Sequence, residues 1–196
     1  HTPLTSGKVR AALAHLPLVW REGPSTTGLV ATLKGGAGKG SAGGSRRVLL
    51  RGDMDALEMP EETGLAFAST FAGRMHACGH DAHTAMLAGA AELLCARADT
   101  LAGEVQFMFQ PGEEGHHGAR FMIDDGLLEP KADAAFALHI MPNSPHGMIA
   151  GKAGPLLASE ACCSIIRASY GGSEWRLRVT EAAAAQLQQS ARQWNA

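Results

Sequence analysis

Eight consecutive residues, 76–83 (HACGHDAH), carry three histidines, one cysteine and one aspartate, and this cluster constrains the fold more than any other stretch. Imidazole nitrogen and thiolate sulfur are preferred ligands of zinc-like ions, and both bind in their deprotonated forms. Gly79 can bend the backbone without a Cβ clash, so Cys78 and His80 can converge on one point. A purely structural zinc knuckle is disfavoured because the chain has no C-x-x-C pair. The cluster therefore predicts a metal-binding turn.

The segments around this turn alternate between strand-like apolar runs and runs of helix formers, which predicts an α/β fold. Asp81 would cap a long helix packed on the sheet, and the glycine-rich segment 35–45 would be a flexible loop. We expect helices over 7–16, 81–97 and 118–124, and strands over 28–33, 48–50, 104–110, 132–140 and 146–150.

Three of the expected strands, 48–50, 104–110 and 132–140, end next to side chains that suit a metal site. Asp53 and Asp55 follow the strand 48–50, and His139 lies near the end of the strand 132–140. In an open parallel sheet, ligands bind beyond the carboxyl ends of the strands. We interpret the two aspartates as anchors for metal-bound histidines; the alternatives are a solvated turn and an adhesion signal formed by the triplet 51–53, which lacks the exposed-loop context of such a signal. A lone histidine is more often structural, but its place at a third strand end favours a ligand.

Glu113 and Glu114 follow directly after the strand 104–110, between glycines that leave the backbone free to aim them differently. Adjacent glutamates are usually solvated surface charge. At a strand end, one of them can ligate a metal while the other activates water, as a hydrolase requires. His116 and His117 are interpreted as bystanders at the start of the next helix.

Composition excludes several classes of partner. The 196 residues include 17 basic and 19 acidic side chains, with a formal net charge of −2 and 45% hydrophobic residues. Without long charge runs, nothing indicates a nucleic acid or an anionic membrane, and no stretch approaches the roughly 20 apolar residues of a membrane span. The four cysteines lack a disulfide-framework spacing, so we expect a cytoplasmic protein.

The motifs at 51–56, 76–83, 110–115 and 137–140 together resemble the M20 metallopeptidase family, and the similarity extends from about Gly28 to Ser159. MHACGHDAH and QPGEEG are its most specific pieces. The resemblance is greatest to the branch of aminoacylases, carboxypeptidases, hippurate hydrolases and auxin-conjugate amidohydrolases. It implies a zinc-peptidase-like α/β fold, with a mixed sheet, flanking helices and an inserted lid domain.

The resemblance also implies roles for individual residues and a reaction. Two divalent ions, Zn, Mn or Co, would be held by Cys78, His80, Glu114 and His139. Glu113 would be the general base and Asp55 a nearby orienting carboxylate. The reaction would be hydrolysis of the amide bond of a small N-acyl amino acid.

The chain also departs from the family pattern. Family members are longer, and after the lid they return to the catalytic domain with one more metal-binding histidine. Ser159–Gly172 is similar to a first lid strand, but Ser173 replaces the expected lid histidine. We therefore expect a truncated member, with a partial catalytic domain over 1–157 and, over 158–196, a lid remnant plus an unrelated helical tail that Thr180 could cap.

Two alternative functions stay open at this point. Cys78 could be a nucleophile with His80 or His83 as its base, although this leaves the glutamate pair and His139 without a role. The chain could also be a catalytically silent fragment that binds metal or serves as an interaction module. An incomplete lid would expose apolar surface and predict self-association into homo-oligomers.

Overall fold

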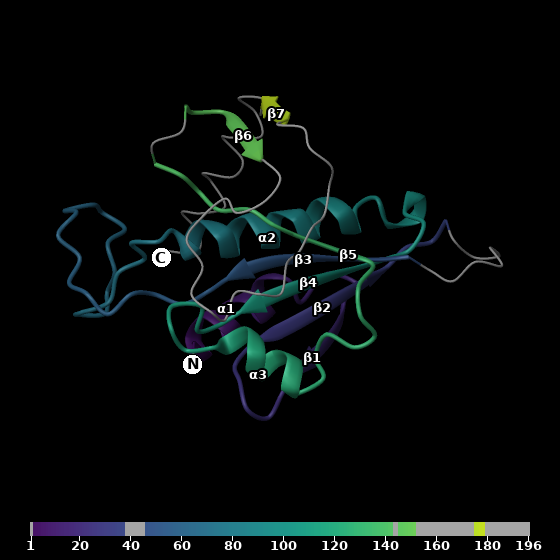
Figure 1. Cartoon of the computed structure of the whole chain (residues 1–196), viewed down its shortest axis with the longest axis horizontal. Coiled ribbons are helices and arrows are strands. Elements are labelled where there is room, and N and C mark those ends of the chain that lie inside the picture. The colour runs from purple at the N-terminus through teal and green to yellow at the C-terminus, as the bar shows by residue number, and fades with distance from the viewer. Residues whose placement is uncertain (1, 38–45, 143–144, 152–174, 179–196) are drawn as a thin grey trace.

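The computed structural model describes residues 2–37, 46–142, 145–151 and 175–178. Figure 1 shows a central sheet with helices on both faces. The predicted α/β fold with a mixed sheet is confirmed. The elements are α1 (Pro3–Ala12), β1 (Val19–Glu22), β2 (Leu29–Lys34), β3 (Arg47–Asp53), α2 (His80–Cys95), a short 3-10 helix (Ala98–Thr100), β4 (Glu104–Gln110), α3 (Gly118–Asp124), β5 (Ala134–Ala137), β6 (Met148–Gly151) and β7 (Trp175–Arg178).

The five strands of the main sheet are ordered β1-β2-β4-β3-β5. β1 and β2 run antiparallel to their neighbours, whereas β3 pairs in parallel with both β4 and β5. Asp53 at the end of β3 is registered with Gln110 at the end of β4, and Arg51 with Ala137 at the end of β5. The carboxyl ends of three parallel strands therefore meet at one edge of the sheet.

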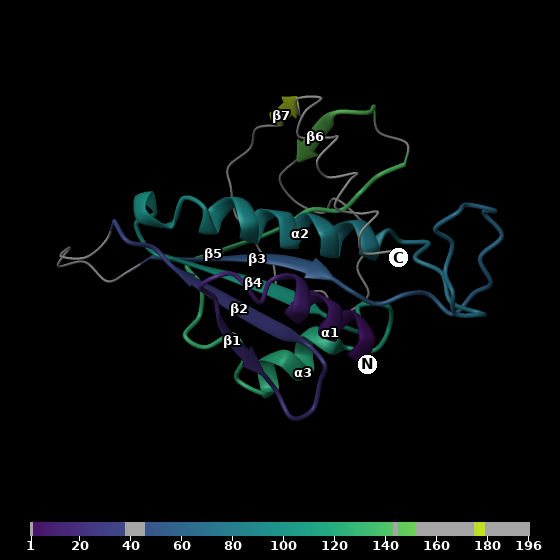
Figure 2. The ribbon, with the colours of Figure 1, turned by 180° about the vertical axis from the view of Figure 1, so that it is seen from behind.

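Alternating side chains of the strands build a core on each face of the sheet. On one face Phe107 and Phe109 of β4 pack with residues of α1 and α2, while on the other Met108 packs with Met122 of α3. This period of two is what a strand covered on both faces requires. Figure 2 shows α1 and α2 from the side opposite to that of Figure 1.

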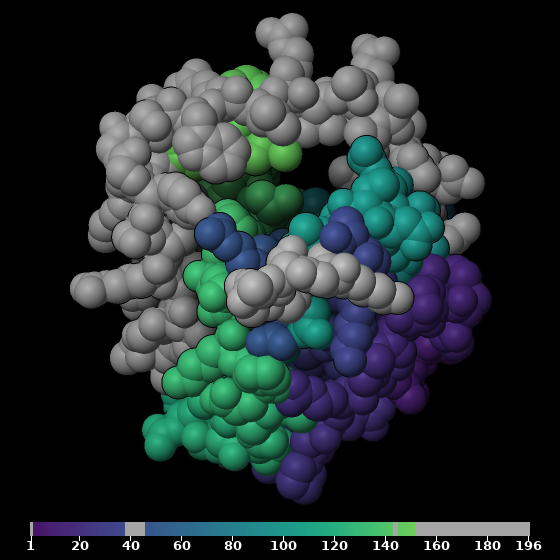
Figure 3. Space-filling view, turned by 90° about the vertical axis from the view of Figure 1, so that its right-hand side faces the viewer, coloured from purple at the N-terminus to yellow at the C-terminus, as the bar shows by residue number. Residues whose placement is uncertain are grey.

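The two helices on the first face also approach each other. His15 Nε2, just beyond α1, lies 3.1 Å from Glu92 Oε1 of α2. The end view in Figure 3 shows the purple N-terminal residues beside the teal end of α2. This is the end of the sheet away from the strand ends that carry the predicted site.

Some boundaries differ from the sequence-based expectations. The first helix starts at Pro3 rather than at residue 7, with proline in its favoured position in the first turn. β1 was not predicted, because the prolines on either side of it indicate a turn; it forms by pairing with β2. Strand β3 is longer than the predicted 48–50 and includes Asp53.

Two predictions near the site are wrong in detail. Asp81 does not cap α2: the N-cap is Gly79, in the left-handed region at φ 80°, and Asp81 lies within the first turn. The strand predicted over 132–140 covers only Ala134–Ala137, so His139 follows the strand instead of lying in it. Its position is therefore not fixed by the sheet's hydrogen bonds.

Other predictions concern residues outside the described part of the chain. These are the lid strand 159–172, the domain boundary at 157 and the helix from Thr180. Among the described residues, no helix combines the length and apolar character needed to cross a bilayer.

Candidate metal centre

The loops after β3 and β4 are held together at the edge of the sheet. The Met54 N–H donates to the Gln110 carbonyl at 2.8 Å, which extends the pairing of the two strands by one residue. The Glu114 N–H donates to Asp55 Oδ2 at 3.0 Å. This contact joins two predicted site residues that lie far apart in the sequence, and it places Asp55 beside the glutamate pair.

The first turn of α2 brings two histidines to the same place. Gly79 adopts a φ of 80°, which strains any residue with a Cβ, and this turn lets the helix begin at His80. His80 and His83 lie three residues apart on one side of the helix. Their rings stack with centroids 5.5 Å apart, and both side chains are 1% exposed.

His80 is surrounded by carboxylates. Its Nδ1 lies 3.3 Å from Asp55 Oδ1, and its Nε2 lies 3.6 Å from Asp53 Oδ2. The same Nε2 is 3.8 Å from Glu114 Oε1 and 3.9 Å from Glu113 Oε2. Despite this proximity, neither nitrogen of His80 has hydrogen-bond geometry to a partner, and Asp55 Oδ1 has none either.

The unpartnered ring nitrogens of His80 and the unpartnered Asp55 Oδ1 indicate whether a metal ion would fit at this position. Buried polar atoms without a partner are costly and are rare in folded proteins. A divalent cation beside Nε2 would satisfy this nitrogen and the Glu113 and Glu114 carboxylates near it, because nitrogen and carboxylate oxygen are both ligands of such ions. The proton of the ring would then be on Nδ1, which faces Asp55 Oδ1. The donor set therefore fits a metal ion.

Cys78 and His139 form a second part of the site. Cys78 Sγ lies 3.4 Å from His139 Nε2. His139 Nδ1 lies 2.7 Å from the carbonyl oxygen of Ile140, so this nitrogen donates and carries the ring proton. Nε2 is then left with its lone pair directed to the cysteine side, which is the form that binds metal.

Within the described residues, three groups of possible ligand atoms lie within 4.8 Å of one another. One contains Cys78, His80 and His139, and another contains His80, Glu113 and Glu114. All four predicted metal ligands and the predicted base therefore lie in two groups that share His80. The third group, Asp53, His80 and His83, includes a histidine that was not predicted to be a metal ligand. The spacing of His80 and His83, one helical turn apart, was the available signal.

The carboxylates shape the acid–base properties of the site. Burial alone would raise the pKa of Asp55, but the His80 ring and the N–H groups of Glu114 and Glu113 outweigh it and lower that pKa to about 2. Burial opposes a charged His80, yet Asp55 and Asp53 raise its pKa. The local field therefore favours positive charge at His80.

The pKa of Cys78 is also raised. Burial and the nearby Glu114 and Glu113 carboxylates raise the pKa of its thiol to about 11. In the metal-free protein the thiol is thus protonated at neutral pH. Binding a cation there must release a proton, as for other cysteine metal sites.

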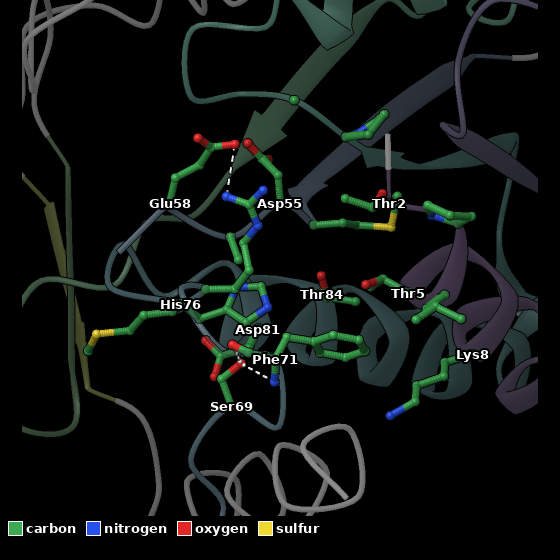
Figure 4. A pocket seen from close by; sticks show the side chains of 18 of the residues that line it. Thr2, Thr5, Lys8, Asp55, Glu58, Ser69, Phe71, His76, Asp81 and Thr84 are labelled. Atoms are coloured by element: carbon green, nitrogen blue, oxygen red, sulfur yellow. Dashed lines mark hydrogen bonds and ion pairs between the residues drawn. The ribbon is translucent and has the colours of Figure 1, made fainter. Parts of the chain in front are cut away.

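A cavity of about 1080 Å³ adjoins the site. Its lining includes Asp55, His76, Thr84, Phe71 of the connection 56–75 and Thr5 of α1, which Figure 4 shows. Asp55 lines this cavity and also contacts His80, whereas Glu113 and Glu114 are not among its lining residues. The two predicted bystanders, His116 and His117, are exposed at the start of α3.

Comparisons with known proteins agree with this geometry. The sequence model of Peptidase family M20/M25/M40 matches residues 49–196. The chain is 42% identical over 164 residues to IAA-amino acid hydrolase ILR1-like 6 of Arabidopsis thaliana, which covers 84% of this chain and 33% of the relative. It is 48% identical over 112 residues to N-acetyl-L-cysteine deacetylase of Bacillus subtilis, covering 57% of this chain and 27% of that protein.

A solved structure gives the same result. A dinuclear metal-binding peptidase of the M20 family from Bacillus subtilis superimposes with a TM-score of 0.69 at 36% identity, covering 78% of this chain and 41% of that one. The present chain spans about a third of the length of the curated relatives it matches. The family match covers more than half of the chain, and we conclude that this protein belongs to peptidase family M20/M25/M40.

Proposed function

We propose that this site is the metal centre of an amidohydrolase that cleaves the amide bond of small N-acyl amino acids. The observation that carries the proposal is the buried His80, with two unpartnered nitrogens among four carboxylates and beside the Cys78–His139 pair. The names of the relatives support the substrate class, since one is an IAA-amino acid hydrolase and another an N-acetyl-L-cysteine deacetylase.

Cys78, His80, Glu114 and His139 would hold two divalent ions. When bound, such ions polarise the scissile carbonyl and lower the pKa of water. The donors suit Zn, Mn or Co, and affinity alone does not select among these in a cell.

The protein's own residues would carry out the proton transfers. Glu113 is 23% exposed and lies beside His80, so its carboxylate can reach a water molecule at the site. It would accept the proton of the attacking water and give it to the leaving amine. Asp55, fixed by the Glu114 N–H, would hold the His80 ring in place.

The thiol-hydrolase alternative has less support. A nucleophilic cysteine needs a lowered pKa, whereas burial and the two glutamates raise the pKa of Cys78.

A cytoplasmic location agrees with Cys78 and Cys95 being free thiols. Self-association agrees with the exposed apolar side chains Phe136, Leu138 and Ile140 after and within the edge strand β5.

Elemental analysis of the purified chain, followed by assay of N-acetyl amino acid hydrolysis with each metal, tests the proposal. We expect two ions per chain, fewer in Cys78→Ala, and no change in His15→Ala, which removes an exposed histidine far from the site. A chain without bound metal would contradict the metal centre. Bound metal without hydrolysis would contradict the enzyme and favour a metal-binding module.

A further inference from the structure

His83 is buried between the two parts of the metal centre, and both of its ring nitrogens are engaged. Its Nδ1 lies 2.6 Å from Asp53 Oδ1, and its Nε2 lies 3.0 Å from the backbone nitrogen of Ile140. A carboxylate can only accept and a backbone N–H can only donate. His83 must therefore carry its proton on Nδ1 and offer the lone pair of Nε2 to the Ile140 amide.

Asp53 is itself held from the other side. Its Oδ2 pairs with Arg51 NH1 at 2.6 Å, and Arg51 Nε donates to Gln110 Oε1 at 2.8 Å. Asp53 is 1% exposed, and burial is outweighed by His83 and Arg51, which lower its pKa. The carboxylate is thus ionised, and one of its oxygens is directed at His83.

The Ile140 amide belongs to the segment that carries His139. This segment follows the last residue of β5, and the side chains of His139 and Ile140 are exposed. The His139 and His83 rings meet edge to face, with centroids 4.7 Å apart. Ile140 also packs over Gly79, where a Cβ would collide with Ile140 Cδ1. These contacts direct His139 Nε2 toward Cys78.

The three groups of possible ligand atoms differ in whether their atoms already have partners within the protein. In the Asp53–His80–His83 group, both nitrogens of His83 and both oxygens of Asp53 have partners within the protein, whereas neither nitrogen of His80 has a hydrogen-bond partner. We propose that His83 is not a metal ligand but a positioning residue, which transmits the orientation of Asp53 to the Ile140 amide and so holds His139 against Cys78. This inference rests on the proposed metal centre.

The role predicts a specific pattern among substitutions of similar size. His83→Met removes both hydrogen bonds, while His83→Gln has a carbonyl oxygen at a comparable distance along the side chain that can accept from the Ile140 amide. Thr84→Val is the matched control, because Thr84 is the next buried residue of α2 and donates to the Asp53 backbone carbonyl at 2.8 Å without contacting Ile140.

The experiment is a cobalt(II) titration of the whole chain, in which the thiolate-to-cobalt absorption band reports binding at Cys78. Chelator competition gives the affinities, and thermal unfolding checks that each variant is folded. We expect His83→Met to weaken the ion at Cys78 by about 10- to 100-fold, the range for loss of a residue that supports a ligand. His83→Gln should recover most of this affinity. Thr84→Val should lower the unfolding temperature and leave the band unchanged.

Several outcomes would overturn the inference. These are wild-type affinity in His83→Met, an equal loss in Thr84→Val, or a loss in His83→Gln as complete as in His83→Met, which would make His83 a ligand. Histidine ring nitrogen NMR of the metal-free chain adds an independent check, because His83 must show the Nδ1–H tautomer. The Nε2–H tautomer would refute the positioning role alone, whereas a wild-type chain that binds no cobalt would refute the metal centre as well.

Discussion

The metal centre has an inner half (Asp55, His80, Glu113 and Glu114) and an edge half (Cys78 and His139), and the two are supported differently. In the inner half, Asp55, Glu113 and Glu114 follow β3 and β4, which are paired along seven residues each, and the buried His80 is the first residue of α2. The edge half depends on a turn and on a segment beyond the four-residue edge strand β5, where His139 is exposed. Sheet register positions the three carboxylates of the inner half, whereas a few side-chain contacts position the edge half. Four predictions test this difference, from the largest expected effect to the smallest.

Replacing Glu113 should have the largest effect, because it removes the proton acceptor while leaving the fold of the inner half intact. We expect Glu113→Gln to lower the rate of N-acetyl amino acid hydrolysis by about 10²- to 10⁴-fold. Metal content, measured by elemental analysis, should stay at the wild-type level. Unchanged hydrolysis would show that Glu113 is not the base.

Removing ligands separates the halves directly. His80 belongs to both ligand groups, so His80→Ala should reduce bound metal more than Cys78→Ala does. The affinity loss in each should exceed the roughly 10- to 100-fold typical of losing a supporting partner. Chelator competition and metal content provide the measurement. A greater loss in Cys78→Ala would reverse the assignment of the inner half as the principal site.

Asp55 links the inner half to acid stability. Its folded-state pKa of about 2 lies below its ordinary value of 3.8, so the ionised group stabilises the fold above about pH 4 and this contribution is lost as pH falls toward 2. The difference corresponds to about 2 kcal/mol. Urea unfolding of metal-free wild type and Asp55→Asn should differ most near neutral pH and converge in acid. For the exposed Asp124→Asn we expect little difference at any pH.

The packing of Ile140 on Gly79 gives the smallest effect and belongs to the edge half. Gly79→Ala should cost about 1–2 kcal/mol, because a residue with a Cβ is strained at a φ of 80°. It should also displace Ile140. The double variant Gly79→Ala/Ile140→Ala should relieve the collision but not the backbone strain, so denaturant unfolding should show partial recovery. Full additivity of the two changes would indicate that the contact does not matter.

The inner half shows why part of the site could be predicted from sequence. Carboxylates that directly follow apolar runs imply strand ends, and parallel strands bring their carboxyl ends to one edge of a sheet. That is how Asp55, Glu113 and Glu114 were placed together. The glycine between Cys78 and His80 likewise predicted a turn, although Gly79 rather than Asp81 caps the helix.

The edge half and its support could not be obtained in this way. His139 was expected within a strand, yet it follows a strand of only four residues. The contacts that hold it join residues 30 and 57 positions apart, His83 to Asp53 and Ile140 to His83. No local pattern encodes such pairs, because they arise only when α2 packs against β3 and the segment after β5 passes the first turn of that helix.

The sequence by itself thus determined the α/β class, the metal-binding chemistry of the cluster at 76–83 and the carboxylates at two strand ends, because periodicity and residue chemistry are local properties. Only the tertiary structure decided that, of His80 and His83, the first lacks hydrogen-bond partners and the second has them. The two histidines lie in the same helical turn with the same burial. They differ in which partners the folded chain brings within hydrogen-bond geometry, and that depends on the packing of segments distant in the sequence.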